Sequence, residues 1–389
     1  MLNVTFTYID KDEWMGGYNY LLNLFSALEI LPGSDIHPML FVGEDVDPNA
    51  IRPFEMHSNV TVMRNKLFNR GWKKRLLSKS VIFGKHRDFE YLFRECGIGL
   101  IFENACFFGW NFKIPTIAWM PDFQHRHLQN MFGFLAYWKR EIGFRVQIFS
   151  KRAILLSSED AKKDFESFYS IDRGKIFVVP FAVEISSKVL RINPITVRSK
   201  YNLPEEFYFL PNQFYKHKNH GLVVEALRIL KDCGKNPVVA VSGNVMDAQA
   251  SELVKRLKEK VRAFHLEKNF LFLGSIPYED VIGLMRTSRA LVNPSLFEGW
   301  STSVEEVKSL GIPMILSDLS VHKEQAEEQA IFFDRNSSNS LAEAFLICSK
   351  LDSEGRHLSE SMAISDARVR RINFAKKFTD VLLHCAKSR

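Results

Sequence analysis

Two glutamates in the second half of the chain carry the clearest chemical signal. Glu298 and Glu306 have seven residues between them, including Gly299 and the run Ser301-Thr302-Ser303. A pattern typical of a buried strand ends just before Glu298, and serine or threonine residues are typical of a helix start. We therefore predict that Glu298 lies on a strand-to-helix loop and Glu306 in the first turn of the helix that follows.

A helix start of this kind has a defined chemistry. Its unpaired backbone N–H groups and the helix dipole favour an anion such as phosphate. Carboxylates repel phosphate but accept strong hydrogen bonds from sugar hydroxyls. A sugar nucleotide, with phosphates between hydroxylated rings, fits both properties. The amides predicted to bind phosphate are those of Gly299, Trp300, Ser301 and Thr302. The alternative is a capping box that pairs Thr302 with Glu305 or Ser303 with Glu306.

The segment resembles the paired-glutamate motif of family 4 glycosyltransferases, which are retaining enzymes of the GT-B fold. Asn293-Pro294-Ser295 before it and Leu310-Gly311-Ile312-Pro313 after it match as well. The resemblance covers most of the chain and is strongest over residues 207–330. It implies two Rossmann-like domains that face each other across a cleft, a UDP- or GDP-sugar as donor substrate, and no cofactor.

The same resemblance suggests roles for further residues. Lys218 matches a lysine that holds the donor diphosphate, whereas Gln213 stands where the family has an arginine. Glu306 would hold the ribose and Glu298 the transferred sugar. The remaining expected donor contacts follow predicted strands and are Gly16, Gly17, Gly243, Asn244 and Ile276. A plain turn is the alternative for the loop residues, and a surface lysine for Lys218.

Candidates for acceptor chemistry follow a predicted strand at 116–120. Pro121-Asp122 stands where many family members have His-Asp, and His125 lies three residues after Asp122. Asp122 or His125 could bind or deprotonate the acceptor hydroxyl, because histidine titrates near neutral pH. The alternative for Asp122 is a helix cap. The resemblance implies front-face transfer without an enzyme nucleophile, in which the leaving phosphate helps to take the acceptor's proton.

A metal site is not expected. The pairs Asp10-Lys11-Asp12 and Asp45-Val46-Asp47 have the DxD spacing with which another glycosyltransferase class holds a divalent metal. Both pairs lie early in polar loop contexts, and such pairs are frequent by chance. His217 and His220 have no carboxylate at ligand spacing beside them.

The composition sets limits on location and partners. A chain of 389 residues suggests two domains, and a net charge of +7 suits anionic partners without choosing among them. We expect no nucleic-acid partner. Five scattered cysteines without a CxxC pair indicate a reducing cytoplasm. There is neither a run of ~20 apolar residues nor a signal-peptide pattern at the start of the chain.

Residues 64–86 mix eight basic side chains with Trp, Phe and Leu. This mixture suits an interfacial surface on anionic lipid, and the alternative is a solvated helix with a few core contacts. It supports the hypothesis of a peripheral protein at the inner face of the cell membrane.

Strand-like and helical patterns alternate throughout, which predicts parallel α/β architecture. We predict an N-terminal acceptor-binding domain at 1–185, a linker at 186–204 and a nucleotide-sugar-binding domain at 205–365. A final helix at 366–389 would, by the resemblance, pack back on the first domain. The predicted strands are 4–8, 37–42, 60–63, 100–103, 116–120, 153–157, 175–180, 207–210, 237–241, 269–273, 289–293 and 313–317. The predicted helices include 20–28, 159–168, 219–232, 247–264, 278–287, 302–310 and 338–350.

The leading hypothesis is a retaining transferase that moves a hexose from a nucleotide-diphosphate sugar to a glycan or lipid-linked glycan, as in polysaccharide or lipopolysaccharide biosynthesis. One alternative is a GT-B-related nucleotide-sugar epimerase, for which no second set of acid and base carboxylates is found. Another is a non-catalytic glycan- or membrane-binding protein with a decayed transferase fold. An NAD-dependent dehydrogenase is less favoured because no GxGxxG follows the first strand.

Overall fold

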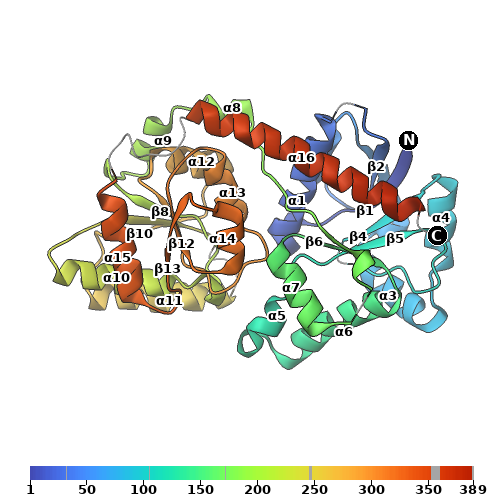
Figure 1. Cartoon of the computed structure of the whole chain (residues 1–389), viewed down its shortest axis with the longest axis horizontal. Helices are drawn as coiled ribbons and strands as arrows, with labels where there is room; N and C mark the ends of the chain where they lie inside the picture. Colours follow the sequence, from blue (N-terminus) through green and yellow to red (C-terminus); the bar gives the residue numbers. More distant parts are fainter. Residues whose placement is uncertain (32, 105, 171, 245–247, 352–359, 388–389) are drawn as a thin grey trace. The chain divides into compact units, whose positions relative to one another are not determined.

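The computed structural model describes residues 1–31, 33–104, 106–170, 172–244, 248–351 and 360–387. The chain forms two compact units, one of Met1–Ala182 with Val369–Arg389 and the other of Val183–Arg368. Each unit has its own parallel sheet with helices around it (Figure 1), which confirms the predicted α/β class. The predicted cleft between two domains stays a prediction.

The first unit contains a parallel sheet in the order β3-β2-β1-β4-β5-β6-β7. Its central strands are short and mostly buried, as expected where helices cover both faces, whereas β3 at the sheet edge is partly exposed. Their bounds are β1 (Leu2–Thr7), β2 (Ile36–Val42), β3 (Thr61–Arg64), β4 (Leu100–Asn104), β5 (Thr116–Trp119), β6 (Ala153–Leu156) and β7 (Ile176–Val178).

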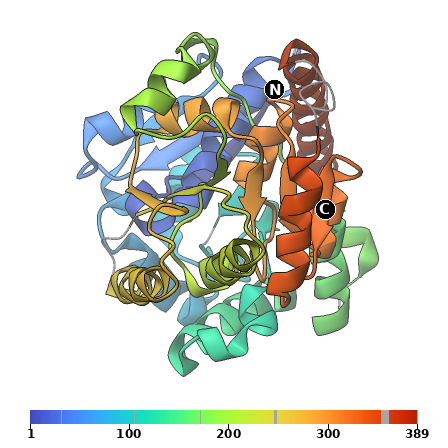
Figure 2. The same ribbon diagram turned by 90° about the vertical axis from the view of Figure 1, so that its left-hand side faces the viewer.

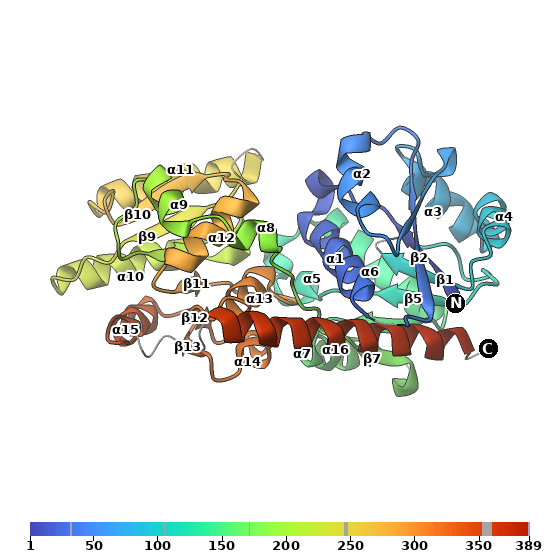
Figure 3. The same cartoon turned by 90° about the horizontal axis from the view of Figure 1, so that it is seen from above.

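The helices of the first unit connect these strands and cover the sheet. They are α1 (Lys11–Glu29), α2 (Pro48–Glu55), α3 (Trp72–Phe83), α4 (Arg87–Glu95), α5 (Gln124–His127), α6 (Phe134–Phe149) and α7 (Glu159–Phe168). The C-terminal part of α16 (Glu360–Lys387) also belongs here and runs beside α1 (Figure 3). Nη2 of Arg371 donates to Oγ of Ser26 at 2.9 Å, and the Phe378 ring packs against Phe6 and Phe102.

The second unit contains a parallel sheet in the order β10-β9-β8-β11-β12-β13. The strands are β8 (Tyr208–Leu210), β9 (Val239–Ser242), β10 (Phe270–Gly274), β11 (Leu291–Asn293), β12 (Met314–Ser317) and β13 (Ala330–Phe333). The helices are α8 (Ser187–Leu190), α9 (Pro194–Lys200), α10 (His220–Asp232), α11 (Ala248–Ala263), α12 (Tyr278–Thr287), α13 (Thr302–Lys308), α14 (Ser320–Ala326) and α15 (Ser338–Ser349).

Alternation along the strands gives the second sheet two apolar faces. Tyr208 and Leu210 pack with α10, α11 and α15, whereas Phe209 packs in a separate core with α9, α12 and α13. The view in which this unit faces the reader shows helices on both sides of its strands (Figure 2). Because successive side chains of a strand point to opposite faces, a run of apolar residues is what such a doubly covered sheet requires.

The strand order of each sheet reverses at one place. In the first sheet β2 and β3 are added on one side of β1, and β4 and the later strands on its other side. In the second sheet β9 and β10 lie on one side of β8, and β11 and the later strands on its other side. Loops at the carboxyl ends of two such strands diverge and leave room for a ligand. The loops after β8 and β11 are therefore the place to look for a site in the second unit.

The structure differs from the sequence prediction in several segments. Residues 186–204, predicted as a linker, form α8 and α9, whose Val189 and Val197 are buried in a core of the second unit. The helix α6 and the strand β13 were not predicted. In the basic stretch 64–86, Phe68, Trp72 and Leu76 are buried in the core of the first unit, so these three residues are not available to a membrane. The predicted helix start at residue 247 lies outside the described residues.

None of the described helices combines the length and the apolar character needed to cross a membrane.

The packing of α16 on the first sheet can be tested by Phe378→Ala. The Phe378 side chain is fully buried, so we expect a loss of about 3 kcal/mol in the free energy of unfolding of the first unit. Val369→Ala, on the same helix but 54% exposed, is the matched control and should change stability little. Urea denaturation checks both variants, and equal stability of the two would contradict the buried placement of Phe378.

Candidate active site

The two loops at the switch point of the second sheet place Lys218 and Glu298 side by side. Lys218 follows β8 in a short 3₁₀ turn, and Glu298 follows β11. Nζ of Lys218 lies 2.6 Å from Oε1 of Glu298, and the two side chains are 16% and 9% exposed. The structure thus brings together two residues that lie 80 positions apart and that the sequence assigned to one site.

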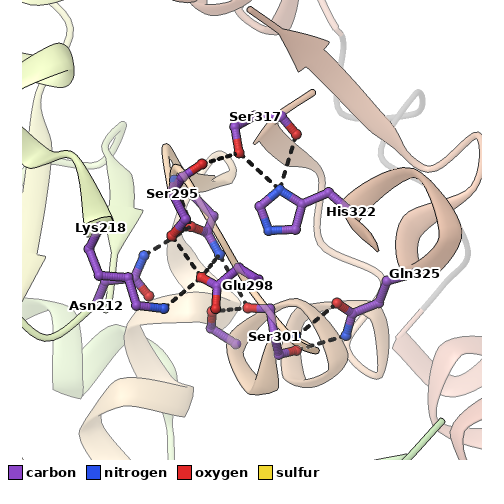
Figure 4. Close-up of polar contacts among 10 residues, drawn as sticks. Asn212, Lys218, Ser295, Glu298, Ser301, Ser317, His322 and Gln325 are labelled. Atoms are coloured by element: carbon purple, nitrogen blue, oxygen red, sulfur yellow. Dashed lines mark hydrogen bonds and ion pairs between the residues drawn. The ribbon is translucent and has the colours of Figure 1, made fainter. Parts of the chain in front are cut away.

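Glu298 accepts further hydrogen bonds from the end of β11 (Figure 4). Oγ of Ser295 lies 2.7 Å and Nδ2 of Asn293 lies 3.5 Å from the same oxygen, Oε1. Asn293 is in turn held by Nδ2 of Asn212 at 3.1 Å. All three bonds from Lys218, Ser295 and Asn293 are made to Oε1, so the geometry fixes the carboxylate while its second oxygen takes none of them.

These contacts keep Glu298 ionised. Burial, the largest single effect, would raise the pKa of Glu298, but the charge and hydrogen bond of Lys218 together with nearby His322 and His217 outweigh it and lower the pKa to about 2. A buried charge is tolerated only when it is paired and hydrogen-bonded. Glu298 is therefore a fixed negative charge at every pH at which the protein would work.

A second layer of side chains supports the Glu298 loop. Oγ of Ser317, at the end of β12, donates to the carbonyl of Ser295 at 2.7 Å, and Nδ1 of His322 lies 3.1 Å from the same hydroxyl. Burial lowers the pKa of His322 to about 4, so its ring is neutral. Nε2 of His322 is buried without a hydrogen-bond partner among the described residues. Such an atom is available to a ligand or a water molecule.

The start of α13 is held by Gln325, a residue that no motif in the sequence indicated. Oε1 of Gln325 accepts from the Ser301 amide at 3.1 Å, and its Nε2 donates to the Ser301 carbonyl at 2.7 Å. The prediction that the Ser301 amide binds phosphate is therefore wrong for this conformation, because that N–H already has a partner. Gly299, Trp300 and Thr302 are half-buried nearby.

The capping-box alternative is not formed. Ser301 is the N-cap residue of α13, and its side chain makes no bond to a helix N–H group. Its hydroxyl instead lies 3.2 Å from Nδ2 of Asn293. The helix start is therefore oriented by the contacts of Ser301 with the strand end and with Gln325 rather than by a capping box.

Glu306 differs from Glu298 in its electrostatics. It lies in α13, its residue is 6% exposed, and it accepts a hydrogen bond from Tyr278 at the start of α12. Burial raises the pKa of Glu306 from an ordinary 4.5 to about 7, and the Tyr278 bond only partly opposes this effect. Without a cation beside it, Glu306 is half protonated near neutral pH. Donated ligand hydroxyls would favour its ionised form.

The loops after β8 and β9 contact each other. Oε1 of Gln213 accepts from the Asn244 amide at 2.7 Å. A side chain on Gly243 would approach the Asn212 carbonyl to 2.6 Å, so glycine is needed there for packing against the β8 loop. This differs from the expectation that Gly243 lets the backbone approach a ligand. Ile276, after β10, is half-buried against the apolar core.

In the first unit, the glycine pair lies against a tryptophan. Trp14 has non-helical backbone angles inside α1, and its ring stacks on Trp119 at 5.2 Å. A side chain on Gly17 would come within 2.4 Å of the Trp14 ring, whereas Gly16 is exposed and its added carbon would meet Trp14 at 3.1 Å. The fold therefore needs Gly17 for packing, and Gly16 is the member of the pair that a ligand could reach.

The predicted acceptor residues have different environments. Asp122 is 22% exposed in its side chain and pairs with Nη2 of Arg140 at 2.6 Å. It also accepts from the Gln124 amide at 2.9 Å, although the N-cap residue of α5 is Phe123 and not Asp122. His125 is fully buried, with Nε2 at 3.1 Å from Glu141. The proposal of His125 as an acceptor base is corrected, because its ring lies inside a packed polar cluster that an acceptor does not reach.

The acidic pairs have local structural roles. Asp10 and Asp47 are N-cap residues of α1 and α2 and accept from the amides of Asp12 and Asn49. Asp45 accepts from the Arg70 amide at 2.7 Å. Within the described ranges, no group of three or more histidine, cysteine or acidic side chains is placed to hold a metal ion.

Comparison with known proteins finds glycosyltransferases, and the matching family model falls within the second unit. The model of the family "Glycosyl transferases group 1" matches residues 195–364. A UDP-Gal:alpha-D-GlcNAc-diphosphoundecaprenol alpha-1,3-galactosyltransferase of Escherichia coli is 27% identical over 174 residues, which is 43% of this chain and 43% of that protein. The chain spans less than half the length of the curated relatives that it matches.

Solved structures resemble the whole chain. A glycosyltransferase from Rickettsia africae ESF-5 covers 100% of this chain and 99% of its own, with a TM-score of 0.71 and 14% identity. Anabaena Alr3699/HepE in complex with UDP and glucose covers 99% and 100%, with a TM-score of 0.68 and 15% identity. The chain therefore has the GT-B fold, and the family match and named relatives support a transferase.

The raised pKa of Glu306 gives a testable pH dependence. A folded-state pKa of about 7 against an ordinary 4.5 means that stability is fully present below 4.5 and is lost as pH rises through 7. Glu306→Gln removes the buried charge, so it should be up to about 3 kcal/mol more stable than the parent at pH 8 and nearly equal to it at pH 5.

Urea denaturation at several pH values measures this difference. Glu343→Gln, an exposed position on α15, is the control and should show no such pH-dependent gain. A Glu306→Gln curve parallel to that of the parent protein from pH 5 to 8 would rule out a protonated, buried Glu306.

Proposed function

We propose that the chain is a retaining glycosyltransferase of family 4 that transfers a hexose from a nucleotide-diphosphate sugar to a glycan or lipid-linked glycan. The observation that carries this proposal is the Lys218–Glu298 pair at the switch point of the second sheet, held by Asn293 and Ser295. A cation for phosphate and an ionised acceptor for hydroxyl groups meet there within 2.6 Å. A sugar diphosphate presents both kinds of partner side by side.

The two glutamates would divide the donor between them. Glu298, ionised and oriented through Oε1, would accept hydrogen bonds from hydroxyls of the transferred sugar. Glu306 would accept from the ribose hydroxyls, because an ionised carboxylate accepts strong hydrogen bonds from hydroxyl groups. Lys218 would contact the diphosphate and stabilise the charge that grows on it as the sugar leaves.

The remaining donor contacts are proposed from their positions. The half-buried Gly299, Trp300 and Thr302 lie between the two glutamates in sequence. Gly16 would supply a backbone contact from the first unit. Gln213 and Asn244 already bond to each other, so they would act as a pair at the edge of the site. Ile276 would contact the base with its main chain.

The transfer would occur on one face of the sugar. The bond between the anomeric carbon and the diphosphate oxygen breaks, and the bond to the acceptor oxygen forms on the same side. The acceptor's proton passes to the departing diphosphate, so no enzyme nucleophile is needed. Asp122 remains a candidate contact for the acceptor hydroxyl, in competition with its bond to Arg140.

The partners are proposed from chemistry and from the relatives. UDP is bound in the HepE structure, and the Escherichia coli relative is named for UDP-Gal and a diphosphoundecaprenol acceptor. These names support a UDP-sugar as donor and a glycan or lipid-linked glycan as acceptor, and a GDP-sugar is the alternative donor that the family resemblance implies. Such an acceptor would place the protein at the cytoplasmic face of a membrane.

Removing the charge of Glu298 tests the catalytic assignment. Glu298→Gln keeps the side-chain shape but weakens the bonds to sugar hydroxyls and releases Lys218, so we expect sugar transfer to fall at least about 100-fold. Product formation with a panel of UDP- and GDP-sugars measures it. Glu279→Gln, exposed at the start of α12, is the control. Intact transfer by Glu298→Gln would refute the assignment.

Removing Lys218 tests the diphosphate contact. Lys218→Met should weaken binding of the nucleoside diphosphate about tenfold, because one charge-assisted bond to phosphate is lost. Lys216→Met, exposed two residues earlier, should bind normally. Calorimetric titration with UDP and GDP measures both variants. A loss confined to Lys216→Met would move the diphosphate contact to Lys216.

A further inference from the structure

The helix α6 exposes a row of large apolar side chains. Phe134, Leu135, Trp138, Ile142 and Phe149 are 76%, 82%, 42%, 54% and 79% exposed. Their spacing of three, four and seven positions puts them on one face of the helix. Most exposed hydrophobic residues occur singly, and a row of five on one helix is typical of an interaction surface.

The opposite face of α6 is already used by the fold. Phe144 and Ile148 pack against a core of the first unit. Glu141 is buried and accepts bonds from Arg126, Arg145 and Tyr169 at 2.8, 2.6 and 2.8 Å. These contacts fix the rotation of α6, so its outward face is a defined surface and not the result of a loosely packed helix.

Positive charges accompany the exposed row. Lys139 is exposed on the same helix. A hollow of about 910 Å³ at the end of α6 is lined by Arg145, Phe149, Lys151 and Lys175 among others. One acidic residue, Asp172, also lines the hollow, and its carboxylate accepts from the Gly174 amide at 3.0 Å. The apolar row therefore ends beside a mainly basic hollow.

We propose that the exposed face of α6, with the hollow beside Phe149, is the surface by which the protein contacts anionic phospholipid. Phe134, Leu135, Trp138, Ile142 and Phe149 would enter the boundary between headgroups and acyl chains. Lys139, Lys151 and Lys175 would meet lipid phosphates. Aromatic and apolar residues flanked by lysine and arginine are the combination that an interfacial helix needs.

The charge pattern favours lipid over a second copy of the chain. In a symmetric dimer the same patch meets itself, so the lysines around α6 would approach each other and repel. An anionic membrane neutralises these charges instead. The stretch 64–86 is the weaker candidate, since Trp72 and Leu76 are buried there and, among the side chains of α3 that the structure describes, Leu77, Ile82 and Phe83 are the exposed large apolar ones. This membrane surface adds to the proposed function. It rests on that function only for the idea that the acceptor lies at a membrane.

Vesicle flotation of the full chain tests this surface without donor or acceptor. The variant Leu135→Ser, Trp138→Ser, Ile142→Ser should bind vesicles of phosphatidylcholine with phosphatidylglycerol at least about tenfold more weakly than the parent protein. The matched control is Leu77→Ser, Ile82→Ser, Phe83→Ser in α3, which should float like the parent. Binding of the parent should also weaken in high salt and on vesicles of phosphatidylcholine alone.

Three results would overturn the proposal: a parent protein that does not float, an α6 variant that floats as well as the parent, or a control that loses binding to the same degree. Light scattering adds a fourth, since a parent dimer that the α6 variant converts to monomers would make the face a chain-to-chain interface. Calorimetry with UDP and GDP separates this outcome from the proposed function. Nucleotide binding without flotation would refute only the proposed membrane surface. Flotation without nucleotide binding would refute only the proposed transferase function.

Discussion

The ion pair between Lys218 and Glu298 is the constraint around which the second unit's site is arranged. A carboxylate that is 9% exposed cannot remain ionised without a partner, because loss of hydration is unfavourable by several kcal/mol. Lys218 supplies the charge, and Ser295 and Asn293 supply further donors. The parallel sheet makes this possible, since β8 and β11 are neighbours in space although they are far apart in sequence.

The two glutamates show how one short segment can hold two different acids. Glu298 lies 2.6 Å from the Lys218 cation and has a pKa of about 2. Glu306 is buried, is hydrogen-bonded by a tyrosine rather than paired with a cation, and has a pKa of about 7. Both shifts follow from surroundings rather than from residue type. Under the proposed function, Glu298 is always ready to accept hydroxyl groups. Glu306 would become a full acceptor only when a ligand's hydroxyls donate to it.

Much of the fold could be predicted from the sequence because buried parallel strands are short apolar runs between turn residues. The helix 159–168 was predicted with its observed bounds, since Ser158 is a clear N-cap. The helix α6 escaped prediction because it is apolar on its outer face as well as its inner one, so it lacks the usual amphipathic period. The strand β13 is a short run that only its pairing with β12 identifies.

The site was predictable only in part, because burial and contacts between distant segments are not visible in a local sequence pattern. Motif spacing identified Glu298, Glu306 and Lys218, but a spacing does not report burial. His125 has the right residue type at the right place in sequence, yet tertiary packing seals its ring against Glu141. Gln325 and His322 come from α14, and no local pattern connects them to the Glu298 loop. Tyr278 likewise reaches Glu306 from a different helix.

The substitution of Gln213 for an arginine has an electrostatic consequence that depends on Lys218. Gln213 carries no charge and its oxygen is engaged by the Asn244 amide, while the charge of Lys218 is already balanced by Glu298. Gln213, Lys218 and Glu298 together therefore offer a diphosphate no net positive charge. Protonation of Glu306 would lower the repulsion of a diphosphate but would also remove an acceptor for ribose hydroxyls. These two effects oppose each other as the pH passes through about 7, so the pH at which the nucleotide binds most tightly depends on whether the diphosphate or the ribose contributes more of the binding energy.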